Sequence, residues 1–274
     1  MVIPLRDDNP TVRFPVVTVL LIVVNCFVYF ALQPHGGAEE SRFTLEHAAV
    51  PCELRQAAPL TIGELVTGDC ESFRGEVEDR EAFPDKNVWF SVIASLFLHA
   101  SLWHLAGNLL FLWIFGNNVE ERFGYVGFAA FYLAAGIVAT ATHVLADPGS
   151  TQPLIGASGA IAGVMGAYLV MWPRARVLTW IPLLLIVVVF LPAWLVLAVW
   201  FGLQFFTSPN ESVAWLAHVG GFVFGVAIAL AVRQLWGPPR PRRAPVEGPP
   251  SGGPGRGGPD DPYGGFRGGY PGRD

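Results

Sequence analysis

The sequence predicts an all-α, polytopic membrane protein in which six helices form a bundle within the bilayer. Hydrophobic residues make up 52% of the 274 positions and charged residues 14%, and the mean hydropathy is +0.45. The chain is too apolar for an ordinary soluble domain and too long for a single span. Most of its apolar segments approach the ~20 residues that a helix needs to cross ~30 Å of hydrocarbon. The segments are residues 14–32, 90–115, 125–145, 156–172, 181–203 and 213–235.

The distribution of basic residues predicts that both termini are cytoplasmic. Arginines precede the first segment and follow the second, fourth and sixth, and such residues mark cytoplasmic loops. The external loop 33–89 carries five basic residues but also twelve acidic ones, and loops of that length are exported largely regardless of charge. We therefore expect a cytoplasmic N-terminus over residues 1–13, a membrane domain over 14–235, and an integral protein of the cell membrane (plasma or inner).

Cys52 and Cys70 share this external loop, whereas Cys26 lies in the first segment. An oxidising exterior would allow the two loop cysteines to pair. Their separation of eighteen residues is only weakly diagnostic, so two free thiols in a folded loop remain the alternative.

Residues 236–274 are dominated by Pro, Gly, Arg and Asp and contain almost no aliphatic side chains. Such a composition buries too little apolar surface to fold, so we expect a disordered cytoplasmic tail. The sequence contains no phosphate-binding loop and no paired-cysteine metal motif, and we expect no cofactor, no metal and no nucleic-acid partner.

Polar side chains in membrane helices are costly and indicate function. The candidates are His99, His104 and Asn108 in the second segment, Ser158 in the fourth and His218 in the sixth. With both termini inside, these three segments run in the same direction. His104, Ser158 and His218 precede the cytoplasmic ends of their segments by twelve, fifteen and fifteen residues, or roughly 18, 22 and 22 Å. We therefore expect them at nearly one depth, closer to the outer surface.

Peptide cleavage needs a nucleophile activated by a base, with donors aimed at the developing oxyanion. Ser158 is the candidate nucleophile and His218 the candidate base. His104 and Asn108 are four residues apart and project from one helix face, which suits a pair of oxyanion donors. The backbone N–H of Ser158 lies in the first turn of its helix and adds a third donor. The membrane segments contain no carboxylate beside His218, so a Ser-His dyad is expected.

Glycines near the site predict close packing of the fourth and sixth segments. Gly159 with Gly163, and Gly221 with Gly225, form small-xxx-small pairs. Packing alone explains most of them, although Gly156 and Gly159 also flank the nucleophile. Residues 157–172 span only about 24 Å, so the loop before them is expected to dip inward and to open a water-filled cavity at the outer face.

Each residue also has a structural interpretation. A membrane serine is commonly bonded to a carbonyl one turn back, a lone histidine is able to join helices or to relay protons, and Asn108 is able to join helices. A proton-coupled transporter is disfavoured, because no intramembrane acid accompanies the histidines.

Together, the motifs closely resemble those of the rhomboid intramembrane serine proteases. The matching stretches are His104-Leu-Ala-Gly-Asn108, Gly156-Ala-Ser158-Gly159 and Ala217-His218-Val-Gly-Gly221. Over residues 14–235 this resemblance implies a six-helix enzyme that cleaves transmembrane protein substrates without metal or cofactor. It implies that Ser158 and His218 are catalytic and that His104 and Asn108 bind the oxyanion. A catalytically silent relative that binds transmembrane segments is the alternative.

The resemblance also implies minor roles and has two departures. It makes His99 structural and puts Asn117, Glu120 and Arg122 in a turn after the second helix. Family members usually carry an aromatic residue four positions after the nucleophile, where this chain has Ala162. We therefore expect His218 to be held less firmly, or by another aromatic residue such as Phe222 or Trp215. The Trp-Arg dipeptide of the first loop is replaced by Trp89-Phe90.

Overall fold

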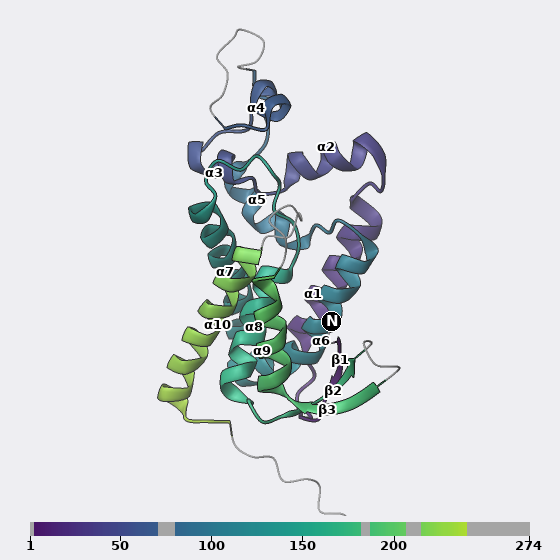
Figure 1. The fold of residues 1–274 in the computed structure, drawn as a ribbon, viewed down its shortest axis with the longest axis vertical. Helices are drawn as coiled ribbons and strands as arrows, with labels where there is room; N and C mark the ends of the chain where they lie inside the picture. Colours follow the sequence, from purple (N-terminus) through teal and green to yellow (C-terminus); the bar gives the residue numbers. More distant parts are fainter. Residues whose placement is uncertain (1–2, 71–79, 182–186, 207–214, 240–274) are drawn as a thin grey trace, which may run out of the picture. The chain divides into compact units, whose positions relative to one another are not determined.

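The computed structural model describes residues 3–70, 80–181, 187–206 and 215–239, and helices dominate them (Figure 1). The predicted tail lies outside the described residues beyond 239. The first half of the chain contains β1 (Ile3–Asp7), α1 (Val16–Phe27), the π-helix η1 (Val28–Leu32), α2 (Gly37–His47), α3 (Pro51–Gln56), α4 (Ile62–Thr67), α5 (Val88–Ala94), the 3-10 helix η2 (Ser95–Phe97) and α6 (Leu102–Phe123). The second half contains α7 (Tyr125–Ala146), α8 (Ser158–Met171), β2 (Arg176–Ile181), β3 (Val187–Pro192), α9 (Ala193–Gln204) and α10 (Trp215–Trp236).

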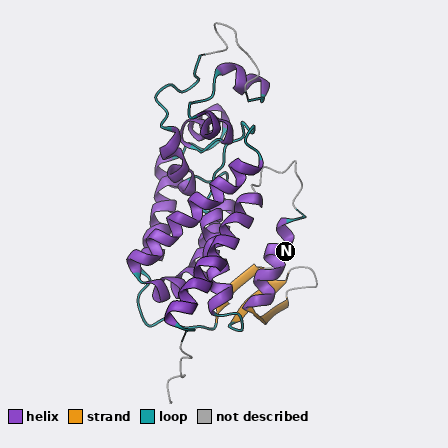
Figure 2. Ribbon diagram, turned by 90° about the vertical axis from the view of Figure 1, so that its left-hand side faces the viewer, coloured by secondary structure: helices purple, strands orange, loops and turns teal. Residues whose placement is uncertain are grey.

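A three-stranded antiparallel sheet corrects the all-α expectation. Its order is β1-β2-β3, and it lies at the end of the helices opposite α2–α4 (Figures 1 and 2). The first strand pairs Ile3 with Trp180, and β2 pairs with β3 from Arg176↔Pro192 to Ile181↔Val187. The N-terminus, expected only as a cytoplasmic segment, therefore contributes a strand.

The expected fifth helix, residues 181–203, is also wrong in its first part. Residues 187–192 are Val-Val-Val-Phe-Leu-Pro, and β-branched and aromatic side chains favour a strand. A proline disfavours helical backbone at the residue before it, and Pro192 itself adopts an extended conformation as the N-cap of α9. The helix therefore begins at Ala193 and contains only 12 residues.

The second apolar segment is broken rather than continuous. The stretch Val88–Phe97 is bent by 80° relative to α6. The new helix starts at Ser101, whose Oγ accepts a hydrogen bond from the backbone N–H of His104 at 3.1 Å. It continues to Phe123, eight residues past the expected end at 115, and stops at Gly124, which has a φ of 74°.

Helix lengths and hydropathies set the number of clear spans among the described residues. On these grounds α7 and α10 are each able to cross a membrane, and α5–η2 together with α6 is a third, broken candidate. The remaining apolar helices, α1–η1, α8 and α9, are shorter. The expected count of six thus goes beyond what helix length establishes.

Helix α8 lies at the centre of the helix packing, with α6, α7, α9 and α10 around it. A Cβ on Gly225 of α10 would overlap the carbonyl oxygen of Gly163, and one on Gly163 would lie 2.6 Å from the Cβ of Ala135 on α7. Only glycine fits at such approaches. In the external loop, a buried ion pair between Lys86 and Glu53 joins α3 to the residues before α5.

Candidate active site

Ser158 and His218 face each other from two helices. Ser158 is the first residue of α8, His218 lies in the first turn of α10, and His218 Nε2 is 2.7 Å from Ser158 Oγ. The helices approach closely enough that a Cβ on Gly221 would overlap the carbonyl oxygen of Gly159. A hydroxyl hydrogen-bonded to an imidazole is the arrangement that an activated nucleophile requires.

His104 and Asn108 lie beside the start of α8. They are one turn apart on α6, and a Cβ on Gly156 would lie 2.9 Å from His104 Nε2 and 3.6 Å from Asn108 Nδ2. Gly156 has a φ of +117°, a conformation that favours glycine. Asn108 Nδ2 is buried and has no hydrogen-bond partner among the described residues. Because Gly156 has no side chain, there is a space next to the first turn of α8. His104 Nε2 and Asn108 Nδ2 border this space.

The segment before α8 is held by η2 and by the external loop. The backbone N–H of Gly156 donates to the Ser95 carbonyl at 2.9 Å, and that of Leu154 donates to the Ala49 carbonyl at 2.7 Å. Beside Ser158 lies a cavity of about 30 Å³, which Ala139 of α7 also lines. A space of that size holds a water molecule.

His99 makes structural contacts rather than contacts with Ser158 or His218. Its ring centroid lies 5.2 Å from that of His104. It is fully buried, its backbone N–H donates to Gln33 Oε1 at 3.1 Å, and Gln33 Nε2 donates to its carbonyl at 2.7 Å. These bonds join the start of α6 to the end of η1, which agrees with a structural residue.

Two residues of α9 that contact His218 were missed by the sequence analysis. His218 Nδ1 lies 2.7 Å from Gln204 Oε1, and the ring of Trp200 lies 5.9 Å from the imidazole between centroids. Phe222, expected to hold the histidine, instead packs against Trp200 and Phe201. No sequence signal identifies Gln204, because a single amide at the end of an apolar segment has no distinguishing spacing.

The residues expected in a turn after the second helix lie within α6. Asn117 Oδ1 accepts from the backbone N–H of Asn118 at 2.6 Å, Glu120 binds the start of α1, and Arg122 donates to the Gly237 carbonyl at 2.5 Å. Glu120 and Arg122 therefore attach other elements to α6, whereas Asn117 binds its own neighbour within that helix.

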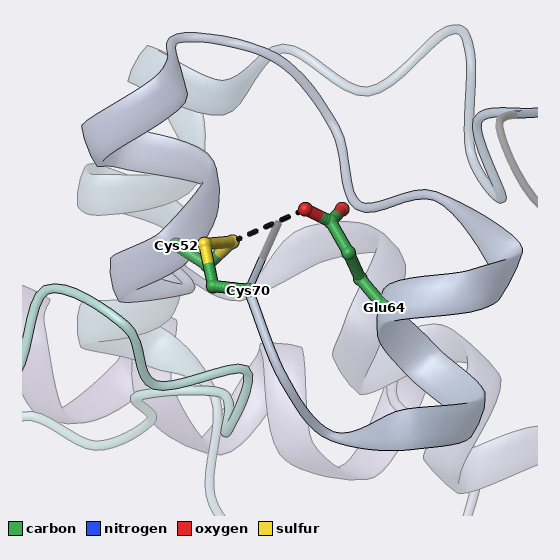
Figure 3. A group of neighbouring side chains, drawn as sticks. All are labelled: Cys52, Glu64 and Cys70. Atoms are coloured by element: carbon green, nitrogen blue, oxygen red, sulfur yellow. Dashed lines mark hydrogen bonds between the residues drawn. A yellow bond between two sulfur atoms is a disulfide. The ribbon is translucent and has the colours of Figure 1, made fainter. Parts of the chain in front are cut away.

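A cluster in the external loop has ligand types that suit a metal, yet it forms a crosslink. The candidate ligand atoms of Cys52, Glu64 and Cys70 lie within 4.8 Å of one another. The two sulfurs are joined in a disulfide, so neither is a thiolate (Figure 3). Glu64 Oε2 accepts from the backbone N–H of Thr61 at 2.8 Å in a capping box that begins α4.

Comparison with known proteins covers the same helices. Residues 86–235 match the Rhomboid domain family. The Rhomboid protease GluP of Bacillus subtilis is 26% identical over 220 residues, covering 80% of this chain and 35% of that protein. Rhomboid protein 1, mitochondrial, of Saccharomyces cerevisiae is 34% identical over 95 residues, or 33% of this chain and 28% of that protein. The Presenilin-associated rhomboid-like protein, mitochondrial, of Bos taurus is 30% identical over 154 residues, 49% of this chain and 36% of that protein. The chain thus spans only about a third of the length of these relatives.

Proposed function

The chain belongs to the rhomboid family of integral membrane proteins, and on this premise we propose that it is a serine endopeptidase that cleaves transmembrane segments of single-span proteins. The observation that carries the proposal is the 2.7 Å contact between His218 Nε2 and Ser158 Oγ. Family members are generally intramembrane serine proteases, and the two residues belong to the matched region. Their contact supports the same chemistry in this chain.

In the proposed reaction, His218 removes the hydroxyl proton of Ser158 as Oγ attacks the carbonyl carbon of the substrate peptide bond. The C–N bond then breaks, the proton passes from His218 to the leaving amine, and an acyl-enzyme remains. A water molecule, deprotonated by His218, hydrolyses this ester and restores the serine. The cavity beside Ser158 supplies a place for that water. The pair acts as a dyad in this proposal.

Stabilisation of the oxyanion is assigned to His104, Asn108 and the backbone N–H of Ser158. The space left by Gly156 lies between the two side chains, and the unpaired Asn108 Nδ2 is available to a new acceptor. The first-turn amide of α8 has the positive end of the helix dipole behind it. Loss of one such donor typically costs ~3–4 kcal/mol of transition-state stabilisation.

The proposed topology has six spans over residues 14–235, both termini in the cytoplasm, and an active-site cavity that opens at the outer face of the cell membrane. Helix α8 has 14 residues, about 21 Å, which is less than the ~30 Å hydrocarbon thickness. Ser158 at its first residue would therefore lie below the outer surface. Bonds between the segment before α8 and the external loop support this side.

Covalent labelling by a fluorophosphonate tests the proposal. The purified chain in detergent should be labelled at Ser158, as read by mass spectrometry of the labelled peptide, and Ser158→Ala and His218→Ala should both abolish labelling. Ser150→Ala and His47→Ala, outside the site, serve as matched controls and should keep it. Equal labelling of all variants would overturn the proposal that the chain is a serine protease. A wild-type chain that binds a transmembrane peptide without being labelled would favour the catalytically silent alternative.

A further inference from the structure

His218 receives its lateral contacts from α9. The position on α8 where an aromatic ring is usual in the family is Ala162, which is fully buried. In its place, Trp200 and Gln204, one turn apart on the same face of α9, both reach the imidazole. The base is thus oriented by a helix other than the one carrying the nucleophile.

The orientation of the Gln204 amide is set by a second hydrogen bond. Its Nε2 donates to the Trp200 carbonyl at 3.2 Å, so the nitrogen end of the amide is directed back along α9. The oxygen end, Oε1, then faces His218 Nδ1 at 2.7 Å. An amide oxygen only accepts hydrogen bonds, which means that Nδ1 must carry the proton.

This proton position matters for the base. A neutral imidazole protonated on Nδ1 has its lone pair on Nε2, and Nε2 is the atom that faces Ser158 Oγ at 2.7 Å. The opposite tautomer would present an N–H to the hydroxyl and would be unable to take its proton. In serine triads, an acceptor on Nδ1 selects this tautomer.

We propose that Gln204 is a positioning residue that holds His218 in the tautomer and orientation needed to deprotonate Ser158. We call this arrangement the Ser-His-Gln relay; Gln204 accepts a hydrogen bond in it but takes no proton, so the chemistry remains that of the Ser158–His218 dyad. The inference rests on the proposed function. Being neutral, the amide orients the imidazole without the charge stabilisation that a carboxylate gives to an imidazolium. The contribution of Gln204 is therefore that of one neutral hydrogen bond.

The test uses Gln204→Met, which keeps the length of the side chain but removes the acceptor, and Gln204→Glu, which keeps the acceptor and adds charge. Gln234→Met, the same change at an exposed position near the end of α10, is the matched control. The second-order rate of fluorophosphonate labelling should fall about five- to tenfold in Gln204→Met, the worth of one net hydrogen bond. It should remain near wild type in Gln204→Glu, with the acid limb of its pH profile shifted to higher pH because a carboxylate favours the imidazolium. Gln234→Met should match wild type in both.

A spectroscopic readout keeps the proposal testable even where activity changes through folding. In protein labelled with ¹⁵N-histidine, with the signals of His218 assigned by their loss in His218→Ala, the imidazole should be in the Nδ1–H tautomer. Gln204→Met should produce a mixture of tautomers, and Gln234→Met should not.

Three results would overturn the relay: an unchanged tautomer in Gln204→Met, an unchanged labelling rate there, or an equal loss in Gln204→Glu, which would indicate packing. A wild-type chain without labelling at Ser158 would overturn the proposed function and the relay with it. Failure of the relay alone leaves wild-type labelling intact.

Discussion

Thr18 of α1 donates to a single carboxylate oxygen of Glu120 on α6 through both its backbone N–H, at 2.7 Å, and its hydroxyl, at 2.6 Å. The other oxygen of Glu120 accepts from the backbone N–H of Val17 at 2.9 Å. The N-cap of α1 is Pro15, which supplies no side-chain acceptor. A carboxylate from a different helix therefore caps α1, at the end where the helix dipole favours negative charge.

Replacing Glu120 with alanine should lower the free energy of unfolding by about 2–3 kcal/mol, because the change leaves first-turn amides of α1 buried without an acceptor. Glu120→Gln retains one acceptor oxygen and should cost less. The measurement is thermal or denaturant unfolding in detergent. Glu121→Ala is the control, since Glu121 accepts longer bonds of 3.3 and 3.4 Å from exposed Val12. Equal losses from both alanine variants would contradict the capping role.

Gly156→Ala should reduce the rate of peptide cleavage about 10²–10³-fold, the effect of losing an oxyanion donor. The added Cβ would occupy the space beside His104 and would also be strained at a φ of +117°. Gly149→Ala lies in the same loop and meets nothing within 4 Å, so it should cleave like wild type. The assay is cleavage of a transmembrane substrate in proteoliposomes. A Gly156→Ala enzyme with wild-type kcat/KM would exclude this space from the site.

Reduction of the Cys52–Cys70 disulfide should destabilise the external loop by about 3 kcal/mol, the loop-closure entropy expected for a separation of 18 residues. Thermal unfolding with and without dithiothreitol measures the effect. Cys26, the free cysteine of α1, provides the control. Cys26→Ala should remain sensitive to reductant, whereas a Cys52→Ala/Cys70→Ala double variant should not. A wild-type transition that ignores reductant would argue for free thiols.

The contact between Ser158 and His218 was predictable from the sequence because the two residues lie at equal counts from the cytoplasmic ends of their segments. Residues counted along parallel helices convert directly into depth. The sheet was not predictable in the same way, since the apolar run before Pro192 is compatible with a buried helix or a strand until its partner is known. The pairing of residues 3–7 with β2 depends on the tertiary structure, and the hydrophobic periodicity of the sequence does not predict it.

Gln204 is a residue of the site that the sequence did not predict. Its partner His218 lies fourteen residues away on a different helix, and the contact depends on how α9 packs against α10. Glu120 was singled out, but as part of a turn, because the donors on α1 that bind its carboxylate are more than a hundred residues away in the sequence. The spacing of residues predicts a motif within one helix, whereas a contact between helices can be predicted only when their packing is known.

Asp7 predicts a pH dependence of stability at the sheet. Burial raises the pKa of its carboxyl from 3.8 to about 6, against the opposing hydrogen bond from the Tyr168 hydroxyl, at 2.7 Å, and that from Asn118 Nδ2, at 2.8 Å. The folded state therefore holds a proton that the unfolded state has released between about pH 4 and pH 6. In this window the contribution of Asp7 to stability falls as the pH rises, and above pH 6 it is constant.

Asp7→Asn, which imitates the protonated acid, should therefore be more stable than wild type at pH 7, and this difference should shrink as the pH falls to 4.5. The melting temperature in detergent, measured from pH 4.5 to 7.5, gives the difference between the two proteins. Because other groups titrate identically in both, this difference isolates Asp7. Asp8→Asn, at the exposed neighbouring position, removes only the smallest of the causes that raise the pKa of Asp7, so it should keep most of the wild-type pH dependence. A difference between Asp7→Asn and wild type that stays constant over the whole range would show that the Asp7 carboxyl is not the titrating group, because a purely steric or hydrogen-bonding effect has no pH dependence.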